Sequence, residues 1–293
     1  MNHDHGRNRD ASSLRTAFFL NLAFTLAEFV GGIWTNSLAI VADAVHDLGD
    51  SFTLGLSWYL QRFSSRAHDS RFSYGYRRYS LLAALISAVV LIVGSITILS
   101  QAIPRLTDPQ PSNAAGMLIF ALAGVAINGL AALRLRGGRS MNARVVAWHL
   151  LEDVLGWIAV LVVSIVLLFT NLRFLDPLLS ILITAYVLYN VGANLRKTLL
   201  LFLQGVPDEI DLPQIEQRLR AIPHVQSTHH THVWSLDGEH HVLTTHLVVP
   251  DSATRDDIIA VRCQVRELID SLDVEHTTIE IEYAQEQCGM REG

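Results

Sequence analysis

Residues 79–104 read YSLLAALISAVVLIVGSITILSQAIP and contain no charged side chain. About 20 helical residues cross the ~30 Å hydrocarbon core of a bilayer, so this run is long enough for one membrane-spanning helix. Charge-free runs of similar character follow at 109–133, 154–172 and 177–195. We therefore expect a membrane-spanning helix from each of these runs.

Two further apolar stretches precede these runs, at about 14–35 and 38–61. The acidic residues within them are Glu28, Asp43, Asp47 and Asp50. Because their flanks are strongly apolar, we expect both stretches to span the membrane as well. The polar segment 1–13 leads into the first span without a convincing cleavage site, which argues against a signal peptide. The prediction is a cytoplasmic segment at 1–13 followed by six membrane-spanning helices within 14–205.

The composition divides the chain into two environments. Of 293 residues, 50% are hydrophobic and 17% are charged, and the mean hydropathy is +0.31. An ordinary soluble domain has about 25% charged residues, so a soluble enzyme over the whole length is disfavoured. Residues 1–205 carry a net charge of +5, whereas residues 206–293 carry −11. This division predicts a membrane part and an acidic water-soluble part, and it disfavours a nucleic-acid partner because the acidic part would repel phosphate.

The positions of the arginines indicate which side faces the cytoplasm. Twelve arginines lie in the N-terminal segment and in the second and fourth loops, and only two lie in the intervening loops. Cytoplasmic loops are enriched in Lys and Arg, so both chain termini are expected in the cytoplasm. This orientation requires an even number of spans. We therefore expect a multi-pass protein of the inner (plasma) membrane.

Residues 206–293 alternate between helical and strand patterns. The expected elements are a helix over 212–221, strands over 225–236 and 240–249, a helix over 254–271 and a strand over 277–283. Asp211 and Pro213 favour the start of the first helix, and Asp237-Gly238-Glu239 suits a hairpin turn between the first two strands. The prediction is a small α/β domain with the order α-β-β-α-β. The cysteines Cys263 and Cys288 form no CxxC pair, and we expect reduced thiols.

Two of the spans carry a histidine and an aspartate four residues apart, His46 with Asp50 and His149 with Asp153. This spacing places both side chains on one helix face, and a rise of ~1.5 Å per residue puts both pairs near the middle of the bilayer. A charge there costs at least ~2.5–3.5 kcal/mol and usually marks a site or a pathway. Two His nitrogens and two Asp oxygens suit tetrahedral Zn²⁺, although imidazole also suits Co²⁺ and Ni²⁺. The alternative is that each pair is a hydrogen-bonded support between helices.

Other carboxylates lie in the same segments. Asp43 precedes His46 by about one turn and can either assist the ligands from outside the coordination sphere or attract the cation along its entry path. Asp47 and Glu152 lie ~100° around the helix from their His neighbours, which makes them weaker candidates as ligands. Glu28, with Asn21, is expected to pack against polar groups of a neighbouring helix.

These residues resemble a known family. The stretch SLAIVADAVHDLGD over 37–50 resembles the second-helix signature of the cation diffusion facilitators, and HLLED over 149–153 matches their fifth-helix HxxxD motif. FSYGYRR over 72–78 resembles the family's loop before the third helix, and HVWSL over 232–236 resembles the tail motif of its zinc-transporting members. The resemblance covers nearly the whole chain. It implies a homodimeric divalent-cation/proton antiporter whose transport site is His46, Asp50, His149 and Asp153.

The resemblance also implies a second metal site in the cytoplasmic part, and this site maps onto His229, His246 and Glu282. Strand alternation by itself places His230 and His232 on one face of the sheet and His229 on the other. The alternative is that these are solvated residues of an acidic sheet.

The chain departs from the family pattern at several positions. Ser80 stands where members often have Glu after the loop motif, and the loop over 134–144 has no histidine, whereas many zinc-transporting members have a His-rich one. Cys288 near the C-terminus can add a thiolate ligand, although a lone tail cysteine usually does not bind metal.

The predicted activity is export of Zn²⁺ in exchange for protons. Ligands must lose protons to bind metal, and the histidines of an empty site take up protons near neutral pH. With alternating access, an inward proton gradient then drives export. The acidic, His-rich segment over 206–293 is expected to sense metal and thereby shift the conformational equilibrium of the transporter. The alternatives are Cd²⁺, Co²⁺, Ni²⁺, Fe²⁺ or Mn²⁺ as cargo, a channel or receptor, and a membrane zinc metalloenzyme; the last is disfavoured because four protein ligands leave no position for water.

Overall fold

The computed structural model describes residues 4–64, 68–135, 141–272, 274–286 and 288. Within these ranges, the side chains that it does not describe are those of 4–18, 20, 54, 57, 58, 61–64, 134, 135, 141–147 and 149. The chain forms two compact units. One comprises Met1–Leu60 and Ala83–Leu195, and the other comprises Gln61–Leu82 and Arg196–Gly293.

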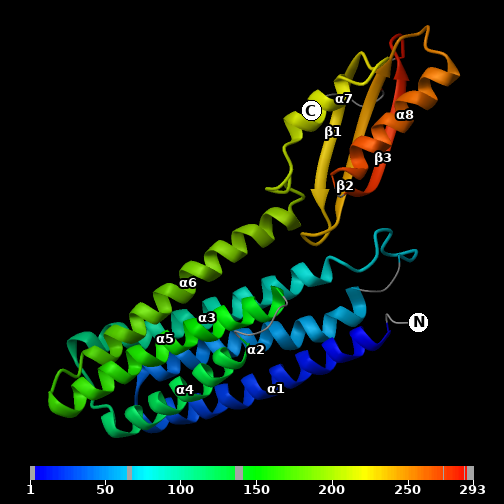
Figure 1. The fold of residues 1–293 in the computed structure, drawn as a ribbon. Coiled ribbons are helices and arrows are strands. Elements are labelled where there is room, and N and C mark those ends of the chain that lie inside the picture. Colours follow the sequence, from blue (N-terminus) through cyan, green and yellow to red (C-terminus); the bar gives the residue numbers. More distant parts are fainter. Residues whose placement is uncertain (1–3, 65–67, 136–140, 273, 287, 289–293) are drawn as a thin grey trace. The chain divides into compact units, whose positions relative to one another are not determined.

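Long helices make up the first two thirds of the chain (Figure 1). They are α1 (Asp4–Thr35), α2 (Leu38–Ser64), α3 (Tyr79–Thr107), α4 (Ala114–Leu135), α5 (Met141–Phe169) and α6 (Leu175–Phe202). By length and composition, α3, α4, α5 and α6 are long and apolar enough to cross a membrane. Each charge-free run of the sequence falls largely within one of these helices, as predicted.

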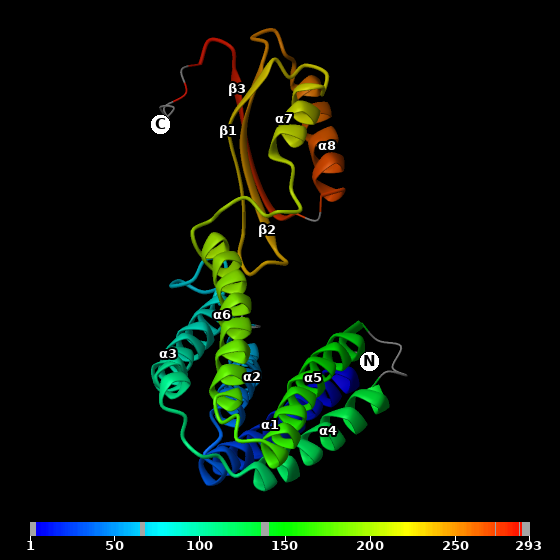
Figure 2. The same cartoon turned by 90° about the vertical axis from the view of Figure 1, so that its left-hand side faces the viewer.

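Glycines let the helices of the first unit approach one another closely. A Cβ atom at Gly124 of α4 would lie 2.2 Å from the ring of Trp157 on α5, so only glycine fits under that ring. Trp157 also meets Phe24 of α1 edge-on, with the ring centroids 6.1 Å apart. Small residues are common where membrane helices meet, because close packing must replace the hydrophobic driving force that lipid does not supply. Figure 2 shows α4 and α5 side by side.

The helix α2 packs against α3 through the same kind of contact. A Cβ atom at Gly49 would lie 2.3 Å from Leu91 of α3, and one at Gly94 of α3 would lie 2.6 Å from Val45. Gly49 immediately precedes Asp50. The part of α2 that carries the His/Asp motif is therefore held tightly against its neighbour.

The second unit contains a three-stranded sheet covered by helices. Its elements are α7 (Leu212–Arg220), β1 (Ser227–Ser235), β2 (His241–Val249), α8 (Arg255–Asp270) and β3 (Val274–Tyr283). The strand order is β1-β2-β3, with β1 antiparallel and β3 parallel to β2. This confirms the predicted α-β-β-α-β order, although β3 begins three residues before the expected position. Figure 2 shows α7 and α8 on the same side of the sheet, where they cover its apolar face.

The ends of these elements follow the local signals of the sequence. The Asp211 carboxylate accepts a hydrogen bond from the Gln214 N–H and caps α7, and Thr254 and Asp257 form a capping box at the start of α8. The hairpin turn between β1 and β2 has Gly238 at φ 105°, a conformation that glycine adopts without strain.

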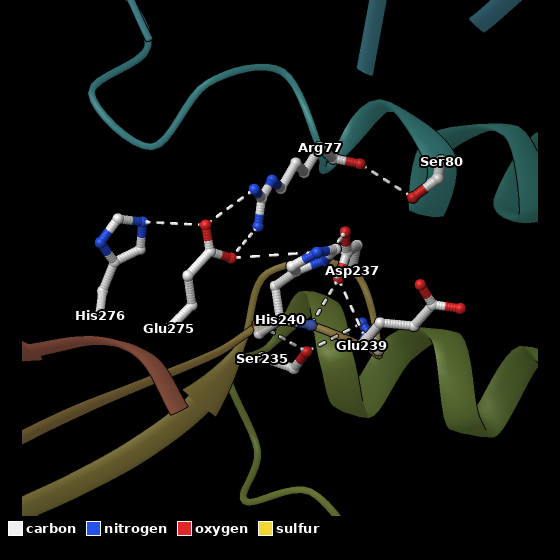
Figure 3. A network of polar contacts seen from close by, with 9 residues as sticks. Arg77, Ser80, Ser235, Asp237, Glu239, His240, Glu275 and His276 are labelled. Atoms are coloured by element: carbon white, nitrogen blue, oxygen red, sulfur yellow. Dashed lines mark hydrogen bonds and ion pairs between the residues drawn. The ribbon is translucent and has the colours of Figure 1, made fainter. Parts of the chain in front are cut away.

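The loop before α3 also belongs to the second unit, and an ion pair attaches it to β3. The Arg77 guanidinium donates hydrogen bonds to both carboxylate oxygens of Glu275 (Figure 3). His240 and His276 lie on either side of that carboxylate, each with Nε2 3.9 Å from one of its oxygens. Asp237 accepts from the His240 backbone N–H and lies 2.7 Å from its Nδ1.

This ion pair gives the loop a predictable pH dependence. Hydrogen bonding from Arg77 is the main cause that lowers the pKa of Glu275 below its ordinary value. A carboxyl group whose pKa falls on folding contributes stability above its unfolded pKa, and that contribution disappears as the pH falls through the lowered folded value. We therefore expect the backbone amides of residues 68–78 to stay protected from hydrogen exchange at pH 5 and to lose protection only below about pH 4.3, the ordinary glutamate pKa. Glu275→Gln is expected to show weak protection at every pH, and identical pH profiles for the two proteins would contradict this account.

Candidate metal centres

The first candidate centre begins with the motif of α2. The His46 Nε2 atom lies 3.7 Å from the Asp50 Oδ2 atom, so the two side chains share one helix face as their spacing predicts. Both are partly exposed, with 23% and 27% of their side-chain surface accessible. Neither side chain of the pair is fully buried, although the His46 Nδ1 and Asp50 Oδ2 atoms are.

The second helix of the predicted centre is α5, and it meets α2 at this level. Ligand atoms of His46, Asp47 and Asp153 all lie within 4.8 Å of one another. Asp153 comes from α5, more than a hundred residues away along the chain. The side chain of His149, the remaining predicted ligand, lies outside the described residues, although its backbone lies in α5 one turn before Asp153. The structure thus brings together one residue of each predicted pair.

Asp47 is a member of this group that sequence spacing favoured only weakly. It lies about 100° around α2 from His46, and this offset turns its carboxylate toward Asp153. Its side chain is buried, with 5% exposed. Spacing along one helix indicates which residues share a face, but not which face meets the partner helix.

The remaining acidic residues differ in their surroundings. Asp43 is buried, and its Oδ1 atom would be 3.4 Å from a Cβ atom at Gly156 of α5, so this carboxylate faces the partner helix directly. Glu28 of α1 is 1% exposed and lies within electrostatic reach of Asp43 and Asp47. Glu152, by contrast, is exposed and accepts a hydrogen bond from the Tyr186 hydroxyl.

A carboxylate from α6 fixes the start of α2. The Asp176 oxygens accept hydrogen bonds from the Ser37 hydroxyl at 2.5 Å, from the Leu38 N–H at 2.9 Å and from the Ala39 N–H at 3.3 Å. Asp176 is 2% exposed and Ser37 is fully buried. The first N–H groups of a helix lack intrahelical partners, and a negative charge there interacts favourably with the helix dipole. Asp176 is therefore a helix cap supplied from another helix, and it sets the position of the motif-bearing α2.

Removing this cap is expected to destabilise the first unit. Asp176→Ala leaves buried donors unpaired, each at a cost of about 1–3 kcal/mol, so the midpoint of denaturant unfolding should fall clearly. Asp176→Asn should lose less stability, because its side-chain carbonyl can still accept hydrogen bonds from the first N–H groups of α2. Asp108→Ala, a change at an exposed acidic residue after α3, serves as the control. Equal midpoints for Asp176→Ala and Asp108→Ala would contradict the capping role.

The second candidate centre lies on the sheet of the second unit. His229 of β1 lies opposite His246 of β2, and His246 lies beside Glu280 of β3. A β-bulge interrupts the register of β1 between His229 and His232, and His230 has φ 47° within it. Such a bulge adds a residue to one strand and re-aims its side chains.

The expectation that His229 and His230 face opposite sides of the sheet is wrong, because the bulge brings both side chains beside His246. The ring centroids of His229 and His230 lie 5.2 and 5.4 Å from that of His246, and 5.3 Å from each other. Regular alternation fails here because the extra residue shifts the strand's period of two. The three imidazoles therefore gather at one place.

A carboxylate and a thiol complete this cluster. The His246 Nδ1 atom lies 2.6 Å from Glu282 Oε1 and 3.8 Å from the Cys288 sulfur, and the His229 Nε2 atom lies 3.2 Å from Glu282 Oε2. Ligand atoms of His229, His246, Glu282 and Cys288 all lie within 4.8 Å of one another. The predicted set of His229, His246 and Glu282 is brought together, and Cys288 joins it.

The chemistry of this donor set fits a zinc-like ion. Zn²⁺ takes four N, O or S ligands in a tetrahedron, which these four side chains can supply. Burial alone would raise the pKa of Glu282, but hydrogen bonds from His246 and Cys288 and the nearby imidazoles lower it below its ordinary value. The carboxylate is therefore ionised at neutral pH and can bind a cation without first losing a proton.

Comparisons with known proteins identify two family domains in the chain. The family model described as the cation efflux transmembrane domain matches residues 14–203, a range that includes the motif-bearing parts of α2 and α5. The model described as the cation efflux protein, cytoplasmic domain, matches residues 207–284. These matches confirm a multi-pass membrane protein whose C-terminal domain is cytoplasmic.

Individual relatives are similar over nearly their full length. The zinc transporter ZitB of Pectobacterium atrosepticum is 34% identical, over 96% of this chain and 88% of that protein. The metal cation efflux system protein CzcD of Cupriavidus metallidurans is 34% identical, over 96% of this chain and 89% of its own. A cadmium, cobalt and zinc/H(+)-K(+) antiporter of Bacillus subtilis is 29% identical, over 96% and 92%. The chain therefore belongs to the cation efflux family, whose members are transporters and not enzymes.

Proposed function

We propose that this protein exports Zn²⁺ from the cytoplasm in exchange for protons, by alternating access to a metal site between α2 and α5. The observation that supports this most strongly is the grouping of His46 and Asp47 of α2 with Asp153 of α5. Groups that can bind metal are costly inside membrane spans, so they are usually retained there for transport or binding. The zinc transporters among the relatives favour Zn²⁺ as the cargo.

The proposed ligands of the transported ion are His46, Asp50, His149 and Asp153. Zn–N and Zn–O bonds are about 2.0–2.2 Å long, so two ligands of one ion lie about 3–4 Å apart. The distance of 3.7 Å between His46 and Asp50 fits that separation. Asp47 is the competing carboxylate, because its ligand atom lies within 4.8 Å of those of His46 and Asp153.

Proton exchange follows from the chemistry of this ligand set. Imidazoles bind metal only when neutral, so the arrival of Zn²⁺ displaces protons and the return of protons displaces Zn²⁺. A site that opens to each side in turn then couples the two flows. The relative named as a cadmium, cobalt and zinc/H(+)-K(+) antiporter supports this type of coupling.

The cytoplasmic centre is proposed to regulate transport in a homodimer in the plasma membrane. The domain over 207–284 belongs to a type named for dimerisation, and residues 206–293 carry a net charge of −11. Two such tails repel each other, and metal bound at His229, His246, Glu282 and Cys288 would reduce that repulsion. Metal would thereby stabilise the arrangement in which the two domains lie close together.

Flux measurements in proteoliposomes test this function. With the protein reconstituted and a pH gradient imposed, uptake of radioactive Zn²⁺ should follow the gradient, stop when an ionophore collapses it, and saturate with zinc concentration. Parallel assays with Cd²⁺, Co²⁺, Ni²⁺, Fe²⁺ and Mn²⁺ identify the preferred cargo. Zinc movement that is indifferent to the pH gradient would refute antiport, and flux favouring another of these metals would reassign the cargo.

A further inference from the structure

A cavity of about 280 Å³ lies in the second unit, between the loop that precedes α3 and the end of β1. The loop residues over 71–79 form most of its lining, and Trp234, Leu236 and Gln204 complete it. Neither metal centre uses this cavity. Its volume is close to the lower end of the range for small-molecule sites, which is about 300–1,000 Å³.

The lining is strongly basic. Arg71, Arg77 and Arg78 all contribute to it. Arg77 is already engaged by Glu275 (Figure 3), but neither Arg71 nor Arg78 forms an ion pair with any residue of the described chain. The Arg78 Nε atom is buried and has no hydrogen-bond partner among the described residues. A buried donor of this kind normally has a partner, so Arg78 can still bind an anionic acceptor at its guanidinium.

The neighbouring acidic residue does not supply that acceptor. The Asp69 carboxylate receives hydrogen bonds from the Arg71 and Phe72 N–H groups and from the Tyr76 hydroxyl, which together shape the loop. The first turn of α3 contains no acidic side chain. With three arginines and one aspartate, residues 68–78 carry a net charge of +2.

The other walls of the cavity are aromatic. The rings of Phe72, Tyr76 and Tyr79 pack together, with centroids 4.6 to 5.9 Å apart, and Trp234 also lines the cavity. Tyrosine and tryptophan gather at the headgroup level of membranes, because each has an apolar ring and a polar donor. A cavity with cationic and aromatic walls suits a ligand that is itself anionic at one end and apolar at the other.

The position of the cavity along the chain points to the membrane as the source of that ligand. Arg78 immediately precedes Tyr79, the first residue of the membrane-spanning α3. The loop lies on the cytoplasmic side, where the inner leaflet is rich in anionic lipid. Basic pockets at this level bind lipid headgroups, and each Lys or Arg near the surface contributes about 1 kcal/mol, or roughly a fivefold increase in affinity.

We propose that this cavity binds the phosphate of an anionic phospholipid headgroup through Arg71 and Arg78. Such a lipid would contact both the loop and Trp234. The proposal does not depend on the identity of the transported metal, and lipid binding is measured without transport.

Native mass spectrometry of the full-length protein, titrated with phosphatidylglycerol or phosphatidylcholine, tests this assignment. We expect saturable binding of phosphatidylglycerol, and binding about 30-fold weaker after Arg71→Gln with Arg78→Gln, at roughly fivefold per arginine. Arg71→Gln alone, at an exposed side chain, should weaken binding about fivefold without disturbing the fold. Arg262→Gln removes the same charge from an exposed position on α8 and should change the affinity less than twofold.

Two further experiments distinguish lipid binding in this cavity from other causes of lipid binding. Trp234→Ala keeps every charge but removes one wall, and we expect it to weaken phosphatidylglycerol binding. Unchanged affinity in Trp234→Ala, or equal losses in the Arg71 and Arg262 variants, would overturn the proposal in favour of general attraction to basic loops. Inorganic phosphate at millimolar concentration should leave the lipid bound, and its displacement of the lipid would overturn the assignment to a membrane source.

Discussion

Replacing Asp50 or Asp153 with alanine is expected to reduce zinc flux driven by a pH gradient by more than about 100-fold. Loss of a group that merely supports a metal ligand typically costs 10–100-fold, and loss of a ligand itself should cost more. The two residues lie on different helices, so equal losses in both variants would indicate one shared site. The measurement is radioactive Zn²⁺ uptake into proteoliposomes that contain equal amounts of each protein.

The control for these variants is Asp108→Ala, which removes an exposed aspartate of the same chain. It should leave the flux unchanged. Asp47→Ala then separates the two carboxylates of α2: a loss smaller than that of Asp50→Ala supports Asp50 as the ligand, and the reverse order would transfer that role to Asp47. Normal flux in both Asp50→Ala and Asp153→Ala would remove the basis for a transport site between α2 and α5.

Replacing His246 with alanine is expected to abolish metal binding at the cytoplasmic centre. His246 is buried, and its ring contacts Glu282, Glu280 and Cys288. We therefore expect the zinc stoichiometry of the full-length protein to fall by one ion per protomer in equilibrium dialysis. The pH-driven flux should persist at saturating zinc but lose part of its dependence on cytoplasmic zinc concentration.

His224→Asn provides the matched control for that experiment. His224 is an exposed histidine of the same domain, outside the cluster, and asparagine tolerates its positive φ of 69°. The His224→Asn protein should bind as many zinc ions per protomer as the unmodified protein. An unchanged stoichiometry in His246→Ala would show that the cluster does not bind zinc, and an unchanged zinc dose response would refute its regulatory role.

The long apolar helices and the placement of His46 and Asp50 on one helix face could be predicted because their signals are local. A charge-free run of sufficient length indicates a span whatever its neighbours are, and a four-residue spacing puts His46 beside Asp50 on any α-helix. The small domain was predictable for the same reason, since Asp211 and Gly238 occupy positions where caps and turns favour those residue types.

Other features depend on contacts between distant segments, and the sequence pattern does not contain them. Asp176 caps a helix that begins some 140 residues earlier, and Cys288 reaches His246 from beyond the last strand. The bulge in β1 brings His229 and His230 to the same imidazole of β2, against the alternation of a regular strand. The sequence shows only that Asp176 begins a span and that Cys288 follows a histidine-rich segment. Neither observation identifies the residue that the side chain contacts.

X-ray absorption spectroscopy at the zinc edge measures whether two imidazoles and two carboxylates from α2 and α5 bind one zinc ion. The sample is the full-length His246→Ala, Cys288→Ser protein, in which the cytoplasmic centre is disabled, loaded with one equivalent of Zn²⁺. We expect one ion per protomer with four N/O ligands at about 2.0–2.2 Å, two of them imidazoles and none of them sulfur. Retention of the same spectrum after alanine replaces His46, Asp50, His149 and Asp153 would contradict it.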